Sequence, residues 1–144
     1  MLAVDTNVLL YAVNARSEYR DVCRRKLEAW RLDATPTFLT WSVIYEFLRV
    51  STRPGAFASP LTSSQSWGFI RGLLESPGFE MLTATSRHSA LLSQTLAELP
   101  EVRGNFAHDV HIAVVLREHG ISQICTNDRD FHRFPFLTVI DPLE

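Results

Sequence analysis

The chain has 144 residues, a formal net charge of −2 and a hydrophobic content of 46%, which together describe one globular domain with a substantial core. Its charged residues, 21% of the total, are spread along the chain and exclude wholesale disorder. No apolar run approaches the roughly 20 residues that a membrane-spanning helix needs, and the first residues lack the pattern of a secretory signal. We therefore expect a cytoplasmic protein with no membrane association, in which Cys23 and Cys125 are two buried thiols.

Short β-rich stretches alternate with segments of helical periodicity. In the first half, we predict a strand at 2–4, helices at 7–14 and 18–32, a strand at 36–39 and helices at 41–51 and 62–74. In the second half, we predict a strand at 79–83, helices at 87–99 and 107–119, a strand at 121–125, a turn or short helix at 127–133 and a strand at 136–140. Because strands alternate with helices and the connections are short, we predict an α/β fold with a mostly parallel sheet.

Asp5 follows directly after the first predicted strand, at the point where a helix begins. In open α/β sheets, this carboxyl edge is where ligands bind. Taken alone, Asp5 has a simpler explanation, since aspartate is a good helix N-cap. The choice between these roles depends on whether other carboxylates reach the same edge.

Three further acidic residues stand in stretches where a charged side chain is not expected. Glu46 lies in a helix that is apolar on most sides, Asp109 lies in the first turn of another apolar helix, and Asp128 follows a strand. Taken singly, Glu46 can pair with Arg49 one turn further on. Asp109 can interact with the helix dipole, and Asp128 can stabilise a turn.

A shared position favours a common role for these carboxylates. Asp5 and Asp128 both follow strands that we expect to be parallel neighbours, and the helix that begins near Asp109 leads into the strand before Asp128. Four carboxylates in one crevice repel one another unless a cation neutralises them. Hard oxygen ligands favour Mg²⁺, with Mn²⁺ as a substitute. Such a site suits phosphoryl or phosphodiester transfer.

The histidines raise the question of a zinc site. His108 and His111 flank Asp109, but zinc sites usually draw three or four N or S ligands, and no other His or Cys is placed to help. We interpret His108 as a residue near the pocket and His111 as a packed supporting residue. The remaining histidines are interpreted as surface or helix-end residues: His88, His119 and His132.

Two other classes of function are weighed against the metal-dependent enzyme. A Mg²⁺-dependent phosphatase of the haloacid dehalogenase type needs a second aspartate two residues after the first, where this chain has Asn7. A receiver domain needs a lysine after a late strand, and Lys26 is the only lysine. The main alternative is a non-catalytic RNA- or protein-binding module on the same fold.

Arginine makes up nearly all of the 14 basic residues. This excess reflects either genomic base composition or a surface for phosphate, which arginine binds with two parallel hydrogen bonds. Helical spacing places Arg16, Arg20, Arg24 and Arg31 close to one face. The net charge of −2 does not by itself indicate a nucleic-acid-binding protein.

Four stretches carry a resemblance to a known family: residues 4–7 (V-D-T-N), Glu46 in a tryptophan-containing helix, residues 105–111 (N-F-A-H-D-V-H) and residues 126–131 (T-N-D-R-D-F). In this order they resemble the PIN-domain ribonucleases and, among these, the VapC toxins of bacterial type II toxin–antitoxin systems. D-T-N alone is weakly specific, whereas T-N-D-R-D-F behind H-D-V-H is fairly specific. The resemblance covers the whole chain, which we expect to be a single PIN domain over residues 1–144.

The resemblance implies a three-layer α/β/α fold around a mostly parallel sheet of about five strands. It also implies a Mg²⁺-dependent endoribonuclease that acts as a toxin and inhibits translation or growth. The metal-binding and catalytic residues implied are Asp5, Glu46, Asp109 and Asp128. The supporting residues implied are Thr6, Asn7 and Thr126, with Thr6 or Asn7 also capping the first helix. Asp130 is a candidate auxiliary acid, which we interpret as a surface residue of its turn.

The resemblance further implies RNA as the substrate, a cognate VapB-like antitoxin whose C-terminal segment blocks the site, and a homodimer. The loop at 53–61 and the helix with Trp67, Phe69 and Ile70 hold many apolar groups. This surplus indicates either an interface or core packing under a lid. The RNA that is cut, the cleavage site and the number of metal ions stay open.

Overall fold

A computed structural model, which describes residues 1–144, contains a five-stranded sheet in which every neighbouring pair of strands is parallel. The spatial order is β3-β2-β1-β4-β5. The strands are β1 (Leu2–Val4), β2 (Thr37–Thr40), β3 (Phe79–Leu82), β4 (Gln123–Cys125) and β5 (Thr138–Ile140). The predicted α/β fold with a parallel sheet is therefore confirmed, and the first strand of the chain is the central one.

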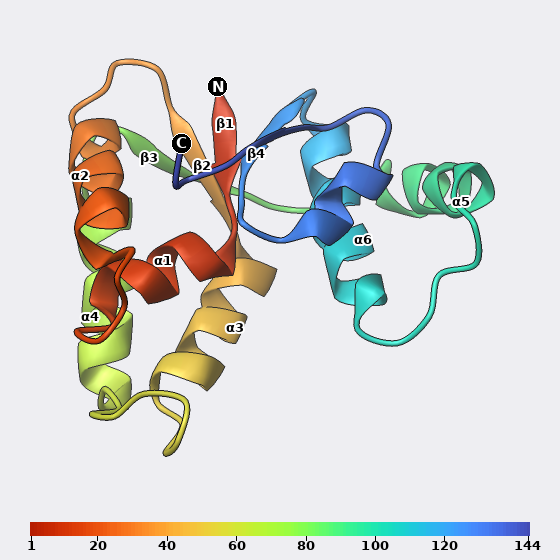
Figure 1. Ribbon diagram of the computed structural model, residues 1–144. Helices are drawn as coiled ribbons and strands as arrows, with labels where there is room; N and C mark the ends of the chain where they lie inside the picture. The colour runs from red at the N-terminus through yellow and green to blue at the C-terminus, as the bar shows by residue number, and fades with distance from the viewer.

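Six α-helices and one 3₁₀ helix surround this sheet. They are α1 (Thr6–Val13), α2 (Arg20–Arg31), α3 (Trp41–Ser51), α4 (Ser63–Leu74), α5 (His88–Glu98), α6 (Phe106–Glu118) and the 3₁₀ helix η1 (Arg129–Arg133). In Figure 1, α2 and α4 lie to one side of the sheet, and α5 and α6 lie to the other. The three-layer arrangement agrees with the prediction. None of the helices is both long and apolar enough to cross a bilayer.

The strand order reverses at β1, which places the ends of β1 and β4 at a switch point of the sheet. From β1 the chain builds outwards through β2 and β3, and then returns to place β4 on the other side of β1. Val4 pairs with Cys125, and the Asp5 amide donates a 3.0 Å hydrogen bond to the Cys125 carbonyl. Asp5 and Asp128 therefore leave the sheet from neighbouring strands. Switch points of this kind are where open α/β sheets bind their ligands.

The buried face of α3 is narrower than its sequence predicts. Val43, Ile44 and Phe47 are at most 1% exposed and join the core. Trp41 and Tyr45, two of the residues that make this helix apolar on most sides, are 45% and 68% exposed. The helix therefore carries an aromatic outer face in addition to its buried face.

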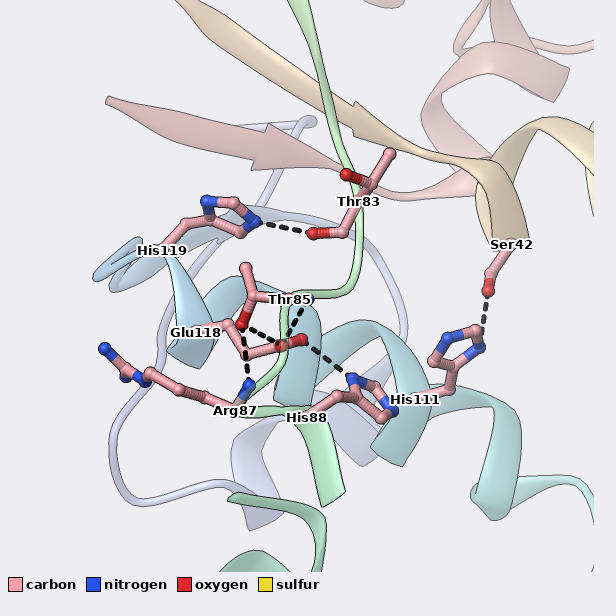
Figure 2. Close-up of polar contacts among 8 residues, drawn as sticks. All are labelled: Ser42, Thr83, Thr85, Arg87, His88, His111, Glu118 and His119. Atoms are coloured by element: carbon pink, nitrogen blue, oxygen red, sulfur yellow. Dashed lines mark hydrogen bonds and ion pairs between the residues drawn. The ribbon is translucent and has the colours of Figure 1, made fainter. Parts of the chain in front are cut away.

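The C-terminal end of α6 holds a buried carboxylate that the sequence analysis did not single out. The Glu118 side chain is fully buried and accepts 2.7 Å hydrogen bonds from the amide and the hydroxyl of Thr85 and from Nδ1 of His88 (Figure 2). Burial alone would raise the pKa of Glu118, but the hydrogen bonds from Thr85 and His88 hold it below its usual value. His88 is the first residue of α5, as its interpretation as a surface or helix-end residue allows, but that interpretation missed its contact with a buried carboxylate.

A second polar contact joins α6 to α3. Nδ1 of His111 lies 2.7 Å from the hydroxyl of Ser42, and the His111 ring packs edge-on against His88 with 5.4 Å between centroids (Figure 2). His111 is exposed, so the interpretation of this residue as a packed one is wrong. Because α3 carries Glu46 and α6 carries Asp109, these contacts fix the relative positions of two helices that reach the predicted site.

Candidate active site

Asp5 is held by hydrogen bonds on both of its carboxylate oxygens. Oδ1 accepts a 2.8 Å bond from the Thr6 amide, which makes Asp5 the N-cap of α1. Oδ2 accepts bonds from Asn7 Nδ2 at 3.0 Å and from Thr126 Oγ1 at 2.7 Å. Asp5 is therefore both a helix N-cap and a carboxylate at the carboxyl edge of the sheet. The expectation that Thr6 or Asn7 would be the cap is wrong.

Thr126 links the carboxyl ends of the neighbouring strands β1 and β4 through hydrogen bonds. Its hydroxyl donates to Asp5 and accepts from Asn7 Nδ2 and from the Asp128 amide, both at 2.9 Å. Asn7 also accepts a 3.1 Å bond from the Asn127 amide through Oδ1. Because Thr126 is 1% exposed, water does not compete for these bonds. The predicted supporting residues therefore lie around Asp5 and fix its orientation.

A second group of carboxylates lies next to Asp5. Asp109, Asp128 and Asp130 each offer an oxygen, and these oxygens all lie within 4.8 Å of one another. Asp128 also caps η1, because its Oδ1 accepts a 2.9 Å bond from the Asp130 amide. Asp130 is exposed, as we expected of a turn residue, yet its carboxylate belongs to this closest group.

The pKa values of Asp5 and Asp109 record how crowded the acidic groups are. Burial raises the pKa of Asp5 to about 6, against the lowering effect of the bonds from Thr126 and Thr6. Burial, followed by the negative charge of Asp128, raises the pKa of Asp109 to about 7. Asp5, Asp130 and Glu46 raise the pKa of Asp109 further, and no hydrogen bond lowers it. Without a cation, the folded protein therefore retains protons that free carboxyls would have released.

Glu46 lies at the rim of the site and not in its buried part. Its side chain is 45% exposed, so the premise that it stands in apolar surroundings is wrong. Thr6 Oγ1 donates a 3.3 Å hydrogen bond to Glu46 Oε2, and Arg49 Nη2 lies 3.7 Å from Oε1. Through Thr6, the first residue of α1, Glu46 is joined to the turn that holds Asp5.

The residues that meet here fit a hard divalent cation. The closest group consists of carboxylates alone and contains no His or Cys, a donor set that suits a hard cation better than it suits zinc. The pKa values of Asp5 and Asp109 are raised first by burial and then by neighbouring carboxylates, and a cation bound here would neutralise this negative charge. The structure thus brings all four predicted acids to one edge of the sheet, with Asp130 as a fifth.

Comparison with known proteins places this arrangement in a family. The family model described as "PIN domain" matches residues 2–137. The chain is 33% identical over 134 residues to Ribonuclease VapC37 of Mycobacterium tuberculosis, covering 93% of this chain and 92% of that relative. It is 32% identical over 150 residues to Ribonuclease VapC33 of the same species, covering 99% of each.

Solved structures show the same fold at lower identity. The crystal structure of VapBC2 from Rickettsia felis bound to promoter DNA includes a chain with a TM-score of 0.70 and 18% identity, covering 96% of each chain. VapC20 of Mycobacterium tuberculosis gives a TM-score of 0.67 at 18% identity, covering 95% of this chain and 97% of that one. With the family match over nearly its whole length, the chain belongs to the PIN-domain family and, within it, to the VapC ribonucleases.

Proposed function

We propose that this protein is a metal-dependent endoribonuclease that acts as the toxin of a VapBC-type pair and inhibits translation or growth. One observation carries the proposal above all: acidic side chains from β1, α3, α6 and the β4–η1 turn converge at the switch point of the sheet. The names of the curated relatives, all ribonucleases of the VapC group, support the same activity. We further propose that residues 1–144 form a single PIN domain.

The residues that would hold Mg²⁺, or Mn²⁺ in its place, are Asp5, Glu46, Asp109 and Asp128, with Asp130 beside them. When bound, such a cation activates water and neutralises charge on the scissile phosphodiester. Thr126, Asn7 and the Thr6 amide hold the Asp5 carboxylate in one orientation. Asp109 accepts no comparable bond, which leaves its oxygens available. Hydrolysis of this type leaves 5′-phosphate and 3′-hydroxyl ends, and we expect these products.

An antitoxin is the protein partner that fits the structure. A cavity of about 440 Å³ lies between α1, α2 and α4, where three arginines, Arg20, Arg24 and Arg31, stand beside apolar groups such as Leu27 and Phe69. Nε of Arg20 is buried without a hydrogen-bond partner. We propose that the C-terminal segment of a VapB-like antitoxin binds in this cavity. Its acidic side chains would pair with the arginines, and its apolar side chains would pack against Leu27 and Phe69. The structural neighbours that support an antitoxin partner include DNA-bound VapBC2 from Rickettsia felis and DNA-bound VapBC from Salmonella typhimurium.

The apolar surplus noted in the sequence divides between core and surface. Phe57 and Ile70 are 8% and 0% exposed and belong to the interior, whereas Trp67 is 37% exposed. Phe69 stacks on Phe47 with 5.4 Å between ring centroids and also lines the arginine cavity. We propose that the exposed apolar groups around α4 form the surface that binds protein partners. We also propose that the protein forms a homodimer.

An RNase assay with and without EDTA tests the function. We expect the purified protein to cut RNA with Mg²⁺, to lose this activity in EDTA and to regain it with excess Mg²⁺ or Mn²⁺. RNA binding without any cleavage, in the presence of either metal, would favour the non-catalytic module instead. Mapping of 5′ ends after controlled expression, wild type against Asp5→Asn, would then identify the RNA.

A further inference from the structure

A small cavity lies beside Glu46, between the helices that carry Glu46 and Asp109. It has a volume of about 270 Å³, and its lining comes from α3 and α6: Ser42, Tyr45, Glu46, Arg49, His108 and Ile112. Ligand pockets usually measure about 300–1,000 Å³, so this one suits a single small unit and not a long segment. Its position makes it continuous with the rim of the acidic site.

Tyr45 is the aromatic wall of this cavity. Its side chain faces away from the buried face of α3, and the residue is 68% exposed. Trp41, one turn earlier, is 45% exposed, with 6.3 Å between the two ring centroids and 51° between their planes. Core packing does not explain either ring. An exposed aromatic ring that lines a cavity next to a cationic side chain is a platform on which a nucleobase can stack.

Arg49 is the cationic wall. Its side chain is 61% exposed, and its one ion-pair partner, Glu46, lies 3.7 Å away, beyond normal hydrogen-bond length. Exposed pairs with this geometry contribute little to stability. The guanidinium is therefore free to turn toward an anion, and its planar fork suits the oxygens of a phosphate.

We propose that this cavity is a nucleotide subsite for single-stranded RNA, in which Tyr45 stacks on a base and Arg49 contacts a phosphate next to the scissile one. The subsite rests on the proposed function, because it places the RNA backbone beside Glu46 and the other carboxylates. Proteins that bind single strands combine cations along the backbone with aromatic side chains under the bases. A duplex keeps its bases stacked on one another and offers none to Tyr45.

Binding of a fluorescently labelled, mixed-sequence single-stranded oligoribonucleotide tests the subsite. The parent protein carries Asp5→Asn so that the probe stays intact, and fluorescence anisotropy measures its affinity in Mg²⁺. We expect Tyr45→Ala and Arg49→Ala each to weaken binding roughly tenfold, and Tyr45→Phe to bind like the parent. The same probe annealed into a duplex should bind equally to the parent and to Tyr45→Ala.

Arg71→Ala is the matched control. Arg71 is also 61% exposed and lies 3.7 Å from Glu75 on the same helix, but α4 carries no carboxylate of the acidic site. This variant should bind the probe like the parent. If it weakens binding as much as Arg49→Ala, the effect is one of net charge and the subsite is wrong.

Other outcomes also overturn the subsite. An Asp5→Asn parent that does not bind the probe, or a Tyr45→Ala variant with parental affinity, contradicts it. Light scattering tests whether this face instead contacts a second copy of the chain. If Tyr45→Ala converts a dimer to a monomer and leaves the RNA affinity unchanged, the aromatic face is a dimer interface and not an RNA subsite.

Failure of the subsite and failure of the proposed function give different results. In the wild-type background, Tyr45→Ala should raise KM and change kcat little, because it removes binding that does not depend on the reaction. If Tyr45→Ala cleaves RNA with an unchanged KM, the subsite is contradicted and the proposed ribonuclease activity is not. If the protein cuts no RNA but its RNA binding depends on Tyr45, the ribonuclease activity is contradicted and the subsite is not.

Discussion

Thr126 donates a 2.7 Å hydrogen bond to Asp5 although 121 positions separate them in the chain. The bond joins the end of β4 to the end of β1, and the same hydroxyl accepts from Asn7 and from the Asp128 amide. One buried hydroxyl therefore orients a carboxylate of the acidic site and also the turn that carries another.

We expect Thr126→Val to impair both stability and cleavage. The substitution keeps the shape of the side chain but removes three hydrogen bonds, one of which is the only bond of the Asp128 amide, at a cost of about 1–3 kcal/mol. Urea unfolding measures the stability, and an RNase assay with saturating Mg²⁺ measures the activity. Thr126→Ser, which keeps the hydroxyl, should restore most of both. A Thr126→Val protein as stable and as active as the wild type would contradict this role of the hydroxyl.

Asp5→Asn should separate activity from stability. We expect cleavage to fall by more than about a hundredfold, the loss that changes in outer-shell residues of a metal site can already produce. The stability of the metal-free protein should change little near neutral pH, because removal of a buried charge offsets the hydrogen bonds that one of the two carboxylate oxygens no longer accepts. Thermal melting in EDTA and an RNase assay measure the two effects.

Asp21→Asn is the control for this variant, since Asp21 is an exposed acid on α2. It should change neither measurement. An Asp5→Asn protein that cuts RNA at the wild-type rate would contradict the assignment of the acidic residues.

The stability of the metal-free protein should fall as the pH rises toward neutrality. The pKa of Asp5 is raised to about 6 and that of Asp109 to about 7, above their ordinary value of 3.8. Their contribution is fully present below the unfolded pKa and is lost as the pH rises through the folded values. Melting temperatures in EDTA should therefore decline from about pH 5 to about pH 7.5.

Millimolar Mg²⁺ should flatten this decline, because a cation that binds only the folded state stabilises it by an amount that grows with the logarithm of its concentration above its Kd. The difference between Mg²⁺ and EDTA should widen as the pH rises. A difference that is absent, or constant across this range, would mean that the cation does not bind these carboxylates.

Glu118→Gln should destabilise the protein by about 1–3 kcal/mol, because an amide cannot replace a carboxylate that accepts from Thr85 and from His88. The lowered pKa of Glu118 predicts a second signature: its stabilisation is present above the unfolded pKa and is lost as the pH falls through the folded pKa. The wild type should therefore lose part of its advantage over the variant in acid. Urea unfolding at neutral and acidic pH measures both effects. Glu75→Gln, an exposed acid with a 3.7 Å ion pair, should have little effect.

The two cysteines should be unreactive in the folded protein. Both are free and buried, and burial raises the pKa of Cys23 and raises that of Cys125 to about 12. Since the thiolate is the reactive form, Ellman's reagent should modify neither thiol until urea unfolds the chain. Rapid modification under native conditions would indicate that the core opens readily around β4.

The convergence of Asp5 and Asp128 could be predicted because parallel strands present their carboxyl ends at one edge. The position of Asp109 at the same edge could also be predicted, because a helix that crosses over between parallel strands begins near this edge. The exposure of Glu46 could not be predicted, since Trp41 and Tyr45 have core-like side chains but face outward. Periodicity in α3 therefore suggested a helix buried on most sides.

Glu118 shows a different limit of sequence reasoning. It lies near the end of a helix, beside His119, where charged residues are usually solvated. Its partners Thr85 and His88 lie about 30 residues earlier in the chain. No local pattern connects them, because the contact depends on how α5 and α6 pack. Only the three-dimensional structure identifies this carboxylate as buried.

The position of β4 beside β1 has a consequence for how the protein is made. The first strand leaves the ribosome early, but its neighbour on the Asp128 side is formed by residues 123–125. Until these late residues emerge, Asp5 lacks both Thr126 and Asp128, and the acidic site cannot assemble. We therefore expect a nascent chain that ends before residues 126–128 to lack nuclease activity, because its acidic site is incomplete.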